Sequence, residues 1–321
     1  MSNADTLARL DALYEAFREG RPRPDKLASW LSAACLLASD DAPDTLVRQV
    51  RGRHAELKSE LGWRSPTDAL RWLYAAMLTQ NNIPVERFLA ARGAVRAKLS
   101  WMDRANLHAG GSRAALMLCI GSKDDTPIER FLEMRAALLP PWWRSNAAIT
   151  DTYAALHAAR GDDPADILAT RTAAEAIFSG HPRARGHKRD GGKMCALLKV
   201  DPGAAMARFE AFDAARQTHK ALRRYGFRQR FVYWAVQGLS VDDALEIDSL
   251  RDALPRSVPS TADARTAVAH LVHTAGRAGL ENDALSAMDA VIAAQTAMMV
   301  SVIAASTAVS SASASSSGSG S

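Results

Sequence analysis

The chain repeats one phrase nearly unchanged, first as Pro84-Val85-Glu86-Arg87-Phe88-Leu89-Ala90-Ala91-Arg92 and then as Pro127-Ile128-Glu129-Arg130-Phe131-Leu132-Glu133-Met134-Arg135. An Ala- and Leu-rich apolar run precedes each copy, and such runs favour helix over strand. A proline at the start of the phrase suits the first turn of a helix, where its missing N–H costs nothing. We therefore expect each copy to begin the second helix of a helix pair.

Fainter relatives of this pattern recur along most of the chain. The apolar cores of the first helices begin at Leu31, Leu73, Ala114, Tyr153, Met194, Tyr233 and Ala269. Their near-constant spacing of about 40 residues lies in the range of helical repeats. A helix pair of this kind cannot bury its apolar stripe alone, so neighbouring pairs must stack. The sequence predicts an all-α fold of stacked antiparallel helix pairs, similar to an α-solenoid.

The second helix of each repeat has its own start signals. They are a proline, preceded by an Asp or Asn that can cap the helix: Asp41 and Pro43, Asn82 and Pro84, Asp125 and Pro127, Asp163 and Pro164, Asp201 and Pro202. In the third repeat, Ile128, Phe131, Leu132 and Leu139 predict one buried stripe along this helix.

Three parts of the chain differ in composition. Residues 1–25 predict an N-terminal helix over 5–18 and a linker that contains Gly20, Pro22 and Pro24. Residues 26–289 carry the helical repeats. Residues 290–321 hold no charged side chain and are rich in Ala and Ser, which predicts a last helix and a disordered end. That segment is the only candidate for contact with a membrane or for self-association, and we do not expect it to span a bilayer.

Basic residues are concentrated in residues 181–230, which contain thirteen Lys and Arg against four Asp and Glu. Such a surface can bind nucleic acid or another polyanion. Aromatic and basic residues also gather in the connections between repeats. The candidate binding residues from both groups are Trp142, Trp143, Arg144, Arg183, Arg185, Lys188, Arg189, Arg223, Arg224, Arg228 and Arg230. Capping of the core by the same residues is the structural alternative.

One arginine recurs at the end of the aligned phrases, as Arg92, Arg135 and Arg171. Its spacing places it near the buried stripe of the second helix. We expect these arginines to pair with acids of the next repeat, and a groove for an anionic ligand is the alternative.

The motifs of several enzyme classes are missing or broken. Residues 186–194 resemble a phosphate-binding loop, but Gly192 intervenes before Lys193, and Met194 stands where a hydroxyl should bind Mg²⁺. We expect a flexible loop there. The sequence predicts no catalytic residue, no metal site and no cofactor.

Three widely spaced cysteines, Cys35, Cys119 and Cys195, lie in apolar runs. They predict buried thiols and a reducing, cytoplasmic compartment, and the N-terminus lacks the pattern of a signal peptide.

The run Leu73-Tyr74-Ala75-Ala76-Met77, the Ile-Glu-Arg-Phe-Leu phrase and the Ala-rich segment ending in Ser317-Gly318-Ser319-Gly320-Ser321 resemble domain-of-unknown-function family four-thousand-and-three. The resemblance covers the chain from about Trp72 onward. It implies a bacterial, all-helical protein and carries over no catalytic residue.

The function predicted from the sequence is a helical repeat scaffold that acts as a protein-interaction or binding module, and another protein is the expected partner. Two alternatives stay open: a polyanion- or nucleic-acid-binding protein that uses the basic region, and an enzyme whose site is not visible in the sequence. Homo-oligomers formed through the C-terminal segment are a further hypothesis.

Overall fold

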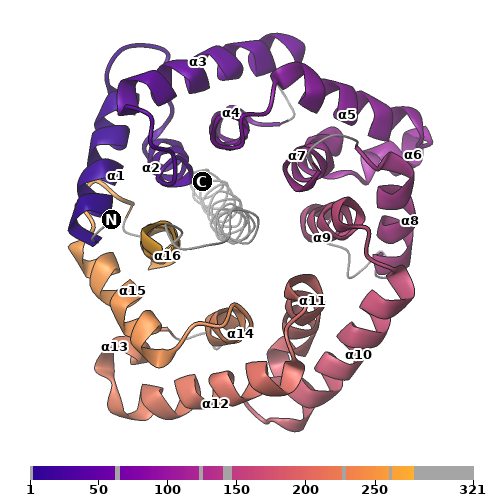
Figure 1. The fold of residues 1–321 in the computed structure, drawn as a ribbon, viewed down its shortest axis with the longest axis vertical. Coiled ribbons are helices and arrows are strands. Elements are labelled where there is room, and N and C mark those ends of the chain that lie inside the picture. The colour runs from indigo at the N-terminus through magenta and orange to yellow at the C-terminus, as the bar shows by residue number, and fades with distance from the viewer. Residues whose placement is uncertain are drawn as a thin grey trace, which may run out of the picture. The chain divides into compact units, whose positions relative to one another are not determined.

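The structure is a computed structural model that describes residues 3–61, 66–122, 126–139, 147–225, 229–259 and 262–277. Within these ranges the regular elements are sixteen α-helices and two short 3-10 helices, with no strand (Figure 1). The all-α prediction is confirmed. Among the described helices, none combines the length and the apolar composition needed to cross a bilayer.

The chain divides into two compact units. Unit 1 comprises the described residues of Met1–Gly52, Ala75–Gln80 and Ile247–Ser321, and unit 2 those of Arg53–Tyr74 and Asn81–Glu246. The divisions fall within three helices: α3 (Pro43–Glu60), α4 (Asp68–Gln80) and α15 (Val241–Ala253). The predicted division into residues 1–25, 26–289 and 290–321 stays a prediction, and its last segment lies outside the described residues.

Unit 1 is built around three helices, α1 (Asn3–Arg18), α2 (Lys26–Cys35) and α16 (Ala262–Arg277), each in contact with the other two. The ring of Tyr14 stacks on Trp30 with 3.9 Å between ring centroids. The guanidinium of Arg265 donates to the carbonyls of Arg251 and Leu254, at 2.9 and 2.7 Å, and so caps the end of α15.

Unit 2 holds two sets of helices that alternate along the chain (Figure 1). One set is α5 (Val85–Ala97), α8 (Ile128–Leu138), α10 (Pro164–Gly180) and α12 (Pro202–Thr218). The other is α7 (Ser112–Gly121), α9 (Ala147–Arg160), α11 (Lys188–Leu198) and α14 (Gln229–Val236). Each helix of the first set contacts the next helix of the second, and neighbours within a set also touch. The short elements are α6 (Trp101–Ala105), η1 (His108–Gly111), η3 (Arg185–His187) and α13 (Lys220–Arg223).

The duplicated phrase has a structural role in both copies. Phe88 and Phe131 are fully buried. Arg87 donates to the carbonyl of Ser122, just after α7, and Arg130 donates in the same way to the carbonyls of Gly161 and Asp162 after α9. Carbonyls at a helix C-terminus lack partners within the helix, so these arginines satisfy them and join one repeat to the next.

Most predicted helix starts are confirmed. Pro43, Pro164 and Pro202 open their helices, and Asp163 and Asp201 cap theirs through side-chain hydrogen bonds. The expected cap at Asn82 is wrong, because Pro84 is the N-cap of α5 and no side chain caps it.

Two further local predictions were wrong. Leu139 is exposed rather than buried because α8 ends at Leu138. The loop expected over residues 186–194 is largely helix, since α11 begins at Lys188. The three cysteines are free and buried, as predicted.

Candidate functional site

A pocket within unit 2 lies where α9, α10 and α11 meet the end of α8. Its lining residues are Leu138, Thr150, Tyr153, His157, Ile167, Arg171, Lys193 and Ala196. The pocket is partly open, with a cavity volume of about 20 Å³ and about 310 Å³ of empty space between its walls when the solvent at the mouth is included. A volume of about 20 Å³ holds one or two water molecules.

The helical period explains how these side chains converge. On α9, Thr150, Tyr153 and His157 are spaced i, i+3, i+7, which places them along one face. Ile167 and Arg171 are four residues apart on α10, and Lys193 and Ala196 are three apart on α11. Each helix therefore presents one face to the same pocket.

Two glycines allow α11 to approach α10 closely. A Cβ at Gly191 would lie 2.9 Å from the ring of Phe178, and one at Gly192 would lie 2.7 Å from Cγ of Glu175 and 3.0 Å from the carbonyl oxygen of Arg171. Any larger residue would force the helices apart. The glycines that suggested a phosphate-binding loop thus serve close helix packing, which brings Lys193 beside Arg171.

The α10–α11 wall of the pocket is cationic. Arg171 Nε lies 2.8 Å from Oε1 of Glu175 on its own helix. Burial and, less strongly, Arg171 lower the pKa of Lys193, while Asp190 and Glu175 act against that shift. Within the part of the chain that the structure describes, Lys193 forms no ion pair. Asp190 instead accepts a hydrogen bond of 2.8 Å from Gln229.

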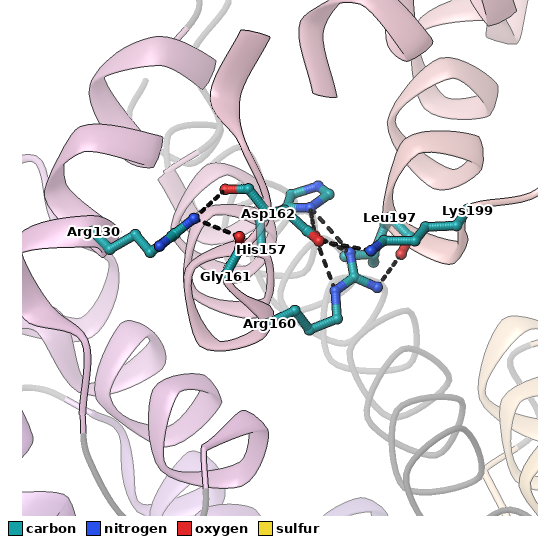
Figure 2. Close-up of polar contacts among 7 residues, drawn as sticks. All are labelled: Arg130, His157, Arg160, Gly161, Asp162, Leu197 and Lys199. Atoms are coloured by element: carbon teal, nitrogen blue, oxygen red, sulfur yellow. Dashed lines mark hydrogen bonds and ion pairs between the residues drawn. The ribbon is translucent and has the colours of Figure 1, made fainter. Parts of the chain in front are cut away.

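The opposite wall contains a histidine held by a buried carboxylate (Figure 2). His157 is 1% exposed, and its Nδ1 lies 2.8 Å from Oδ2 of Asp162. The same carboxylate pairs with Arg160 at 2.6 Å and with Lys199 at 2.9 Å. Burial alone would raise the pKa of Asp162, but the hydrogen bonds from His157, Lys199 and Arg160 outweigh it and lower that pKa to about 2.

Helix termini fix the position of Asp162. After α9, Gly161 adopts a φ of 75°, its N–H donates to the carbonyl of Ala158, and the N–H of Asp162 donates to that of His157. This is the Schellman ending of a helix, which returns the chain over its last turn. It places the carboxylate of Asp162 against the ring of His157, five residues earlier.

The charge state of the histidine follows from these contacts. Burial lowers the pKa of His157 in spite of its hydrogen bond to Asp162, so the ring is neutral at pH 7. An ionised carboxylate only accepts hydrogen bonds, so Nδ1 carries the single proton. The second ring nitrogen, Nε2, lies on the side away from Asp162 and Arg160 in Figure 2. Without a proton, Nε2 is a hydrogen-bond acceptor, and its residue lines the pocket.

None of the described residues that the sequence predicted as binding residues lines this pocket. Arg183 is exposed and pairs with Asp213, and Arg223 donates to carbonyls of α12. Five others are exposed or half-buried: Arg185, Arg189 and Arg224 are exposed, and Lys188 and Arg230 are half-buried. Trp142, Trp143, Arg144 and Arg228 lie outside the described residues.

The recurring arginines behave differently from one another. Arg92 donates to the hydroxyl of Ser112 at 3.0 Å, and Arg135 pairs with Asp151 of α9 at 2.7 Å. Both partners belong to the next repeat, but only that of Arg135 is the expected acid. Arg171 instead pairs within its own helix and lines the pocket, which matches the groove alternative.

Sequence reasoning missed most of this site. It noted Arg171 and Lys193 but assigned Lys193 to a loop, and it did not single out His157, Arg160 or Asp162. A signal was present: Tyr153 and His157 lie four residues apart in an Ala-rich helix, on the face that should be buried. Polar groups on such a face require partners.

Comparison of the chain with protein families, with curated proteins and with solved structures finds no significant match. The resemblance to domain-of-unknown-function family four-thousand-and-three stays a prediction.

Proposed function

We propose that the protein is a helical repeat binding module, and that the pocket between α9, α10 and α11 binds the carboxylate of a small organic acid. Lys193 carries this proposal. It is a cation on the wall of a pocket, and it lacks an ion-pair partner among the described residues.

The charge around the pocket supports an anionic ligand. Three cationic groups, Arg171, Arg189 and Lys193, act there against two carboxylates, Glu175 and Asp190. A charge-assisted hydrogen bond from an ammonium or guanidinium is among the strongest that a carboxylate can accept. A bound anion would offset the hydration that the ammonium group of Lys193 loses on burial.

Apolar walls support an organic acid over an inorganic ion. Leu138, Ile167 and Ala196 line the same pocket, and the last two are buried. A short hydrocarbon chain can contact them while its carboxylate faces Lys193. Small-molecule sites commonly combine apolar walls with a few polar groups in this way.

The scaffold in this proposal is an α-solenoid-like array of antiparallel helix pairs in unit 2. It is supported by the alternation of the two helix sets and by the contact of each helix with the next. Repeat arrays build binding sites where neighbouring repeats meet, and the pocket lies between consecutive repeats.

The test is calorimetric titration of the full chain with butyrate. We expect saturable binding that weakens about 10- to 100-fold in Lys193→Met, because a charge-assisted hydrogen bond contributes about 1.5–3 kcal/mol. Lys188→Met, at the half-buried start of the same helix, is the matched control and should bind like the wild type. Failure of butyrate, acetate and valerate to bind the wild type would refute the proposal.

An enzyme is the second candidate, favoured by one observation. A histidine oriented by a buried carboxylate, in a pocket that also contains Lys193 and Tyr153, is the arrangement of a general base. A screen of small esters and amides would test it. Turnover that disappears in His157→Gln, with folding intact, would support the enzyme, and the absence of turnover with every substrate would exclude this class.

The basic-region hypothesis also stays a proposal. Nucleic-acid affinity should fall steeply with added salt and weaken in the Arg185→Ala/Arg189→Ala/Arg224→Ala variant, whose three side chains are exposed. Absence of binding at low salt would remove the idea. That the partner is another protein, and that the compartment is the cytoplasm, likewise remain predictions.

A further inference from the structure

The two walls of the pocket offer opposite hydrogen-bonding chemistry. Lys193 and Arg171 are donors only, whereas Nε2 of a neutral His157 is an acceptor. A simple carboxylate has acceptors alone. It can accept hydrogen bonds from Lys193 and Arg171, but it has no N–H or O–H group to donate to Nε2 of His157.

We propose that the pocket selects carboxylates that also carry a hydroxyl group, with the carboxylate at Lys193 and Arg171 and the hydroxyl donating to Nε2 of His157. This inference rests on the proposed function and specifies its ligand class as small hydroxy acids. His157 is then the residue that determines specificity.

The acceptor state of Nε2 is fixed by the surroundings of Nδ1. Oδ2 of Asp162 lies 2.8 Å from Nδ1, and that carboxylate is kept ionised by Arg160 and Lys199 at 2.6 and 2.9 Å. Protonation of Nε2 in place of Nδ1 would set two acceptors, Nδ1 and the carboxylate, against each other. The tautomer with the proton on Nδ1 is therefore the stable one.

Arg160 is also close to the ring, with Nη2 at 3.0 Å from Nδ1. The same guanidinium donates to Oδ2 of Asp162 from both Nε and Nη2, at 3.0 and 2.6 Å, and to the carbonyl of Leu197. The contact of Nη2 with Nδ1 would be a hydrogen bond only if Nδ1 lacked a proton, and Nδ1 would then face the ionised Oδ2 at 2.8 Å as a second acceptor. The shorter contact of Nη2 is with Oδ2, so we assign its donor to the carboxylate. Nδ1 retains its proton, and Nε2 retains its lone pair.

Confinement makes the selection effective. His157 is 1% exposed, and the cavity volume of about 20 Å³ corresponds to one or two water molecules, so little water can reach Nε2. A ligand without a donor would leave Nε2 buried and unsatisfied, which carries a cost of the size of a lost hydrogen bond. We therefore expect 2-hydroxybutyrate to bind at least about fivefold more tightly than butyrate, which has the same carbon skeleton.

Two other pocket groups are hydroxyls, Tyr153 and Thr150. Each can donate as well as accept, so each can adapt to a ligand with or without a hydroxyl. We therefore expect His157, rather than Tyr153 or Thr150, to distinguish 2-hydroxybutyrate from butyrate.

The experiment uses the full wild-type chain, which avoids variants that fail to fold. The affinities of butyrate and of both enantiomers of 2-hydroxybutyrate are measured by calorimetry. In parallel, the two ring nitrogens of His157 are followed by ¹⁵N NMR. We expect a protonated Nδ1, an unprotonated Nε2 before ligand is added, and an Nε2 resonance that shifts with one hydroxy acid enantiomer far more than with butyrate.

The outcomes separate this inference from the proposed function. Equal affinities for butyrate and both hydroxy acids, or a proton on Nε2 in the unliganded protein, would overturn the inference while carboxylate binding stands. If none of the acids binds, the proposed function fails, whatever the tautomer. His157→Met supplies a third measurement: in the folded variant the preference for the hydroxy acid should disappear, and its persistence would contradict the role of His157.

Discussion

Arg135 and Arg171 occupy equivalent positions in two successive repeats. Arg135 forms a buried ion pair, whereas Arg171 lines a pocket. Arg135 meets Asp151 on α9, which is fully buried, and its Nη2 also donates to the carbonyl of Asn106 at 3.1 Å. The backbone N–H of His108 donates to the second oxygen of Asp151 at 2.8 Å. Both oxygens of Asp151, and Nε and Nη2 of Arg135, thus have partners within the protein.

Arg171 finds its carboxylate on its own helix instead. Glu175 lies one turn further along α10, and the two side chains are 20% and 24% exposed. Its neighbour on the same wall of the pocket is Lys193 of α11 rather than an acid. The comparison teaches that this position forms a buried ion pair at Arg135, where the next helix supplies a carboxylate, and lines a pocket at Arg171, where it does not.

The largest loss of stability should come from breaking the buried ion pair of Arg135 and Asp151. Asp151→Ala leaves the guanidinium of Arg135 buried without its carboxylate, and we expect a loss of about 3–5 kcal/mol in the free energy of unfolding. Glu175→Gln is the matched control, because it removes the partner of Arg171 at a half-exposed site and should cost about 1 kcal/mol or less. Urea unfolding of both variants measures the difference, and equal losses would contradict the distinction between the two sites.

The double variant Arg135→Met/Asp151→Leu sharpens this test. Replacement of a buried pair by apolar side chains is often neutral, because the desolvation cost of both charges is removed with their attraction. We expect it to recover a large part of the stability that Asp151→Ala loses. No recovery would show that the Asn106 and His108 contacts matter more than the pairing of charges.

The next largest change in stability should come from disturbing the close packing of α10 and α11. Gly192→Ala places a methyl group 2.7 Å from Glu175 Cγ and 3.0 Å from the carbonyl oxygen of Arg171, so the helices must separate. We expect a loss of roughly 1–3 kcal/mol. Gly93→Ala in α5, where nothing lies within 4 Å of the added methyl group, should instead stabilise the protein by about 0.5–1 kcal/mol. Thermal unfolding distinguishes the two signs.

The contacts of the Asp162 carboxylate make the stability of the protein depend on pH. Its folded pKa of about 2 lies below the ordinary value of 3.8. A lowered carboxyl pKa contributes stability above the unfolded pKa and loses it as the pH falls through the folded one. We expect Asp162 to contribute about 2 kcal/mol at pH 6, and this contribution should decline between about pH 4 and pH 2. Comparison with Asp162→Asn over that range tests it, and a constant difference would contradict it.

The smallest effect belongs to the surface pair of Lys98 and Glu129. The two charges lie 2.8 Å apart, but their side chains are 57% and 70% exposed. Solvent screens such a pair, so Glu129→Gln should leave the unfolding midpoint unchanged within the error of calorimetry. A clear loss of stability would mean that this pair contributes more than its exposure allows.

Much of the fold followed from the sequence, because helix periodicity and capping are local. The apolar cores that begin at Leu31 and Tyr153, for example, both lie in buried helices, and Asp163 and Asp201 cap helices as expected. The pocket did not follow. It depends on the approach of α11 to α10, which the pair Gly191-Gly192 permits, and a glycine pair read along the chain equally suggests a loop.

The central claim is that Arg171 of α10 and Lys193 of α11 bind the carboxylate of a ligand, whereas Arg135 is paired with the carboxylate of Asp151 within the protein. The direct measurement is the dissociation constant of 2-hydroxybutyrate for the full chain, for Lys193→Met and for Lys188→Met. We predict saturable binding to the wild type and to Lys188→Met, and binding at least about tenfold weaker in Lys193→Met. Equal affinity in all three proteins, or no binding to any of them, would contradict the claim.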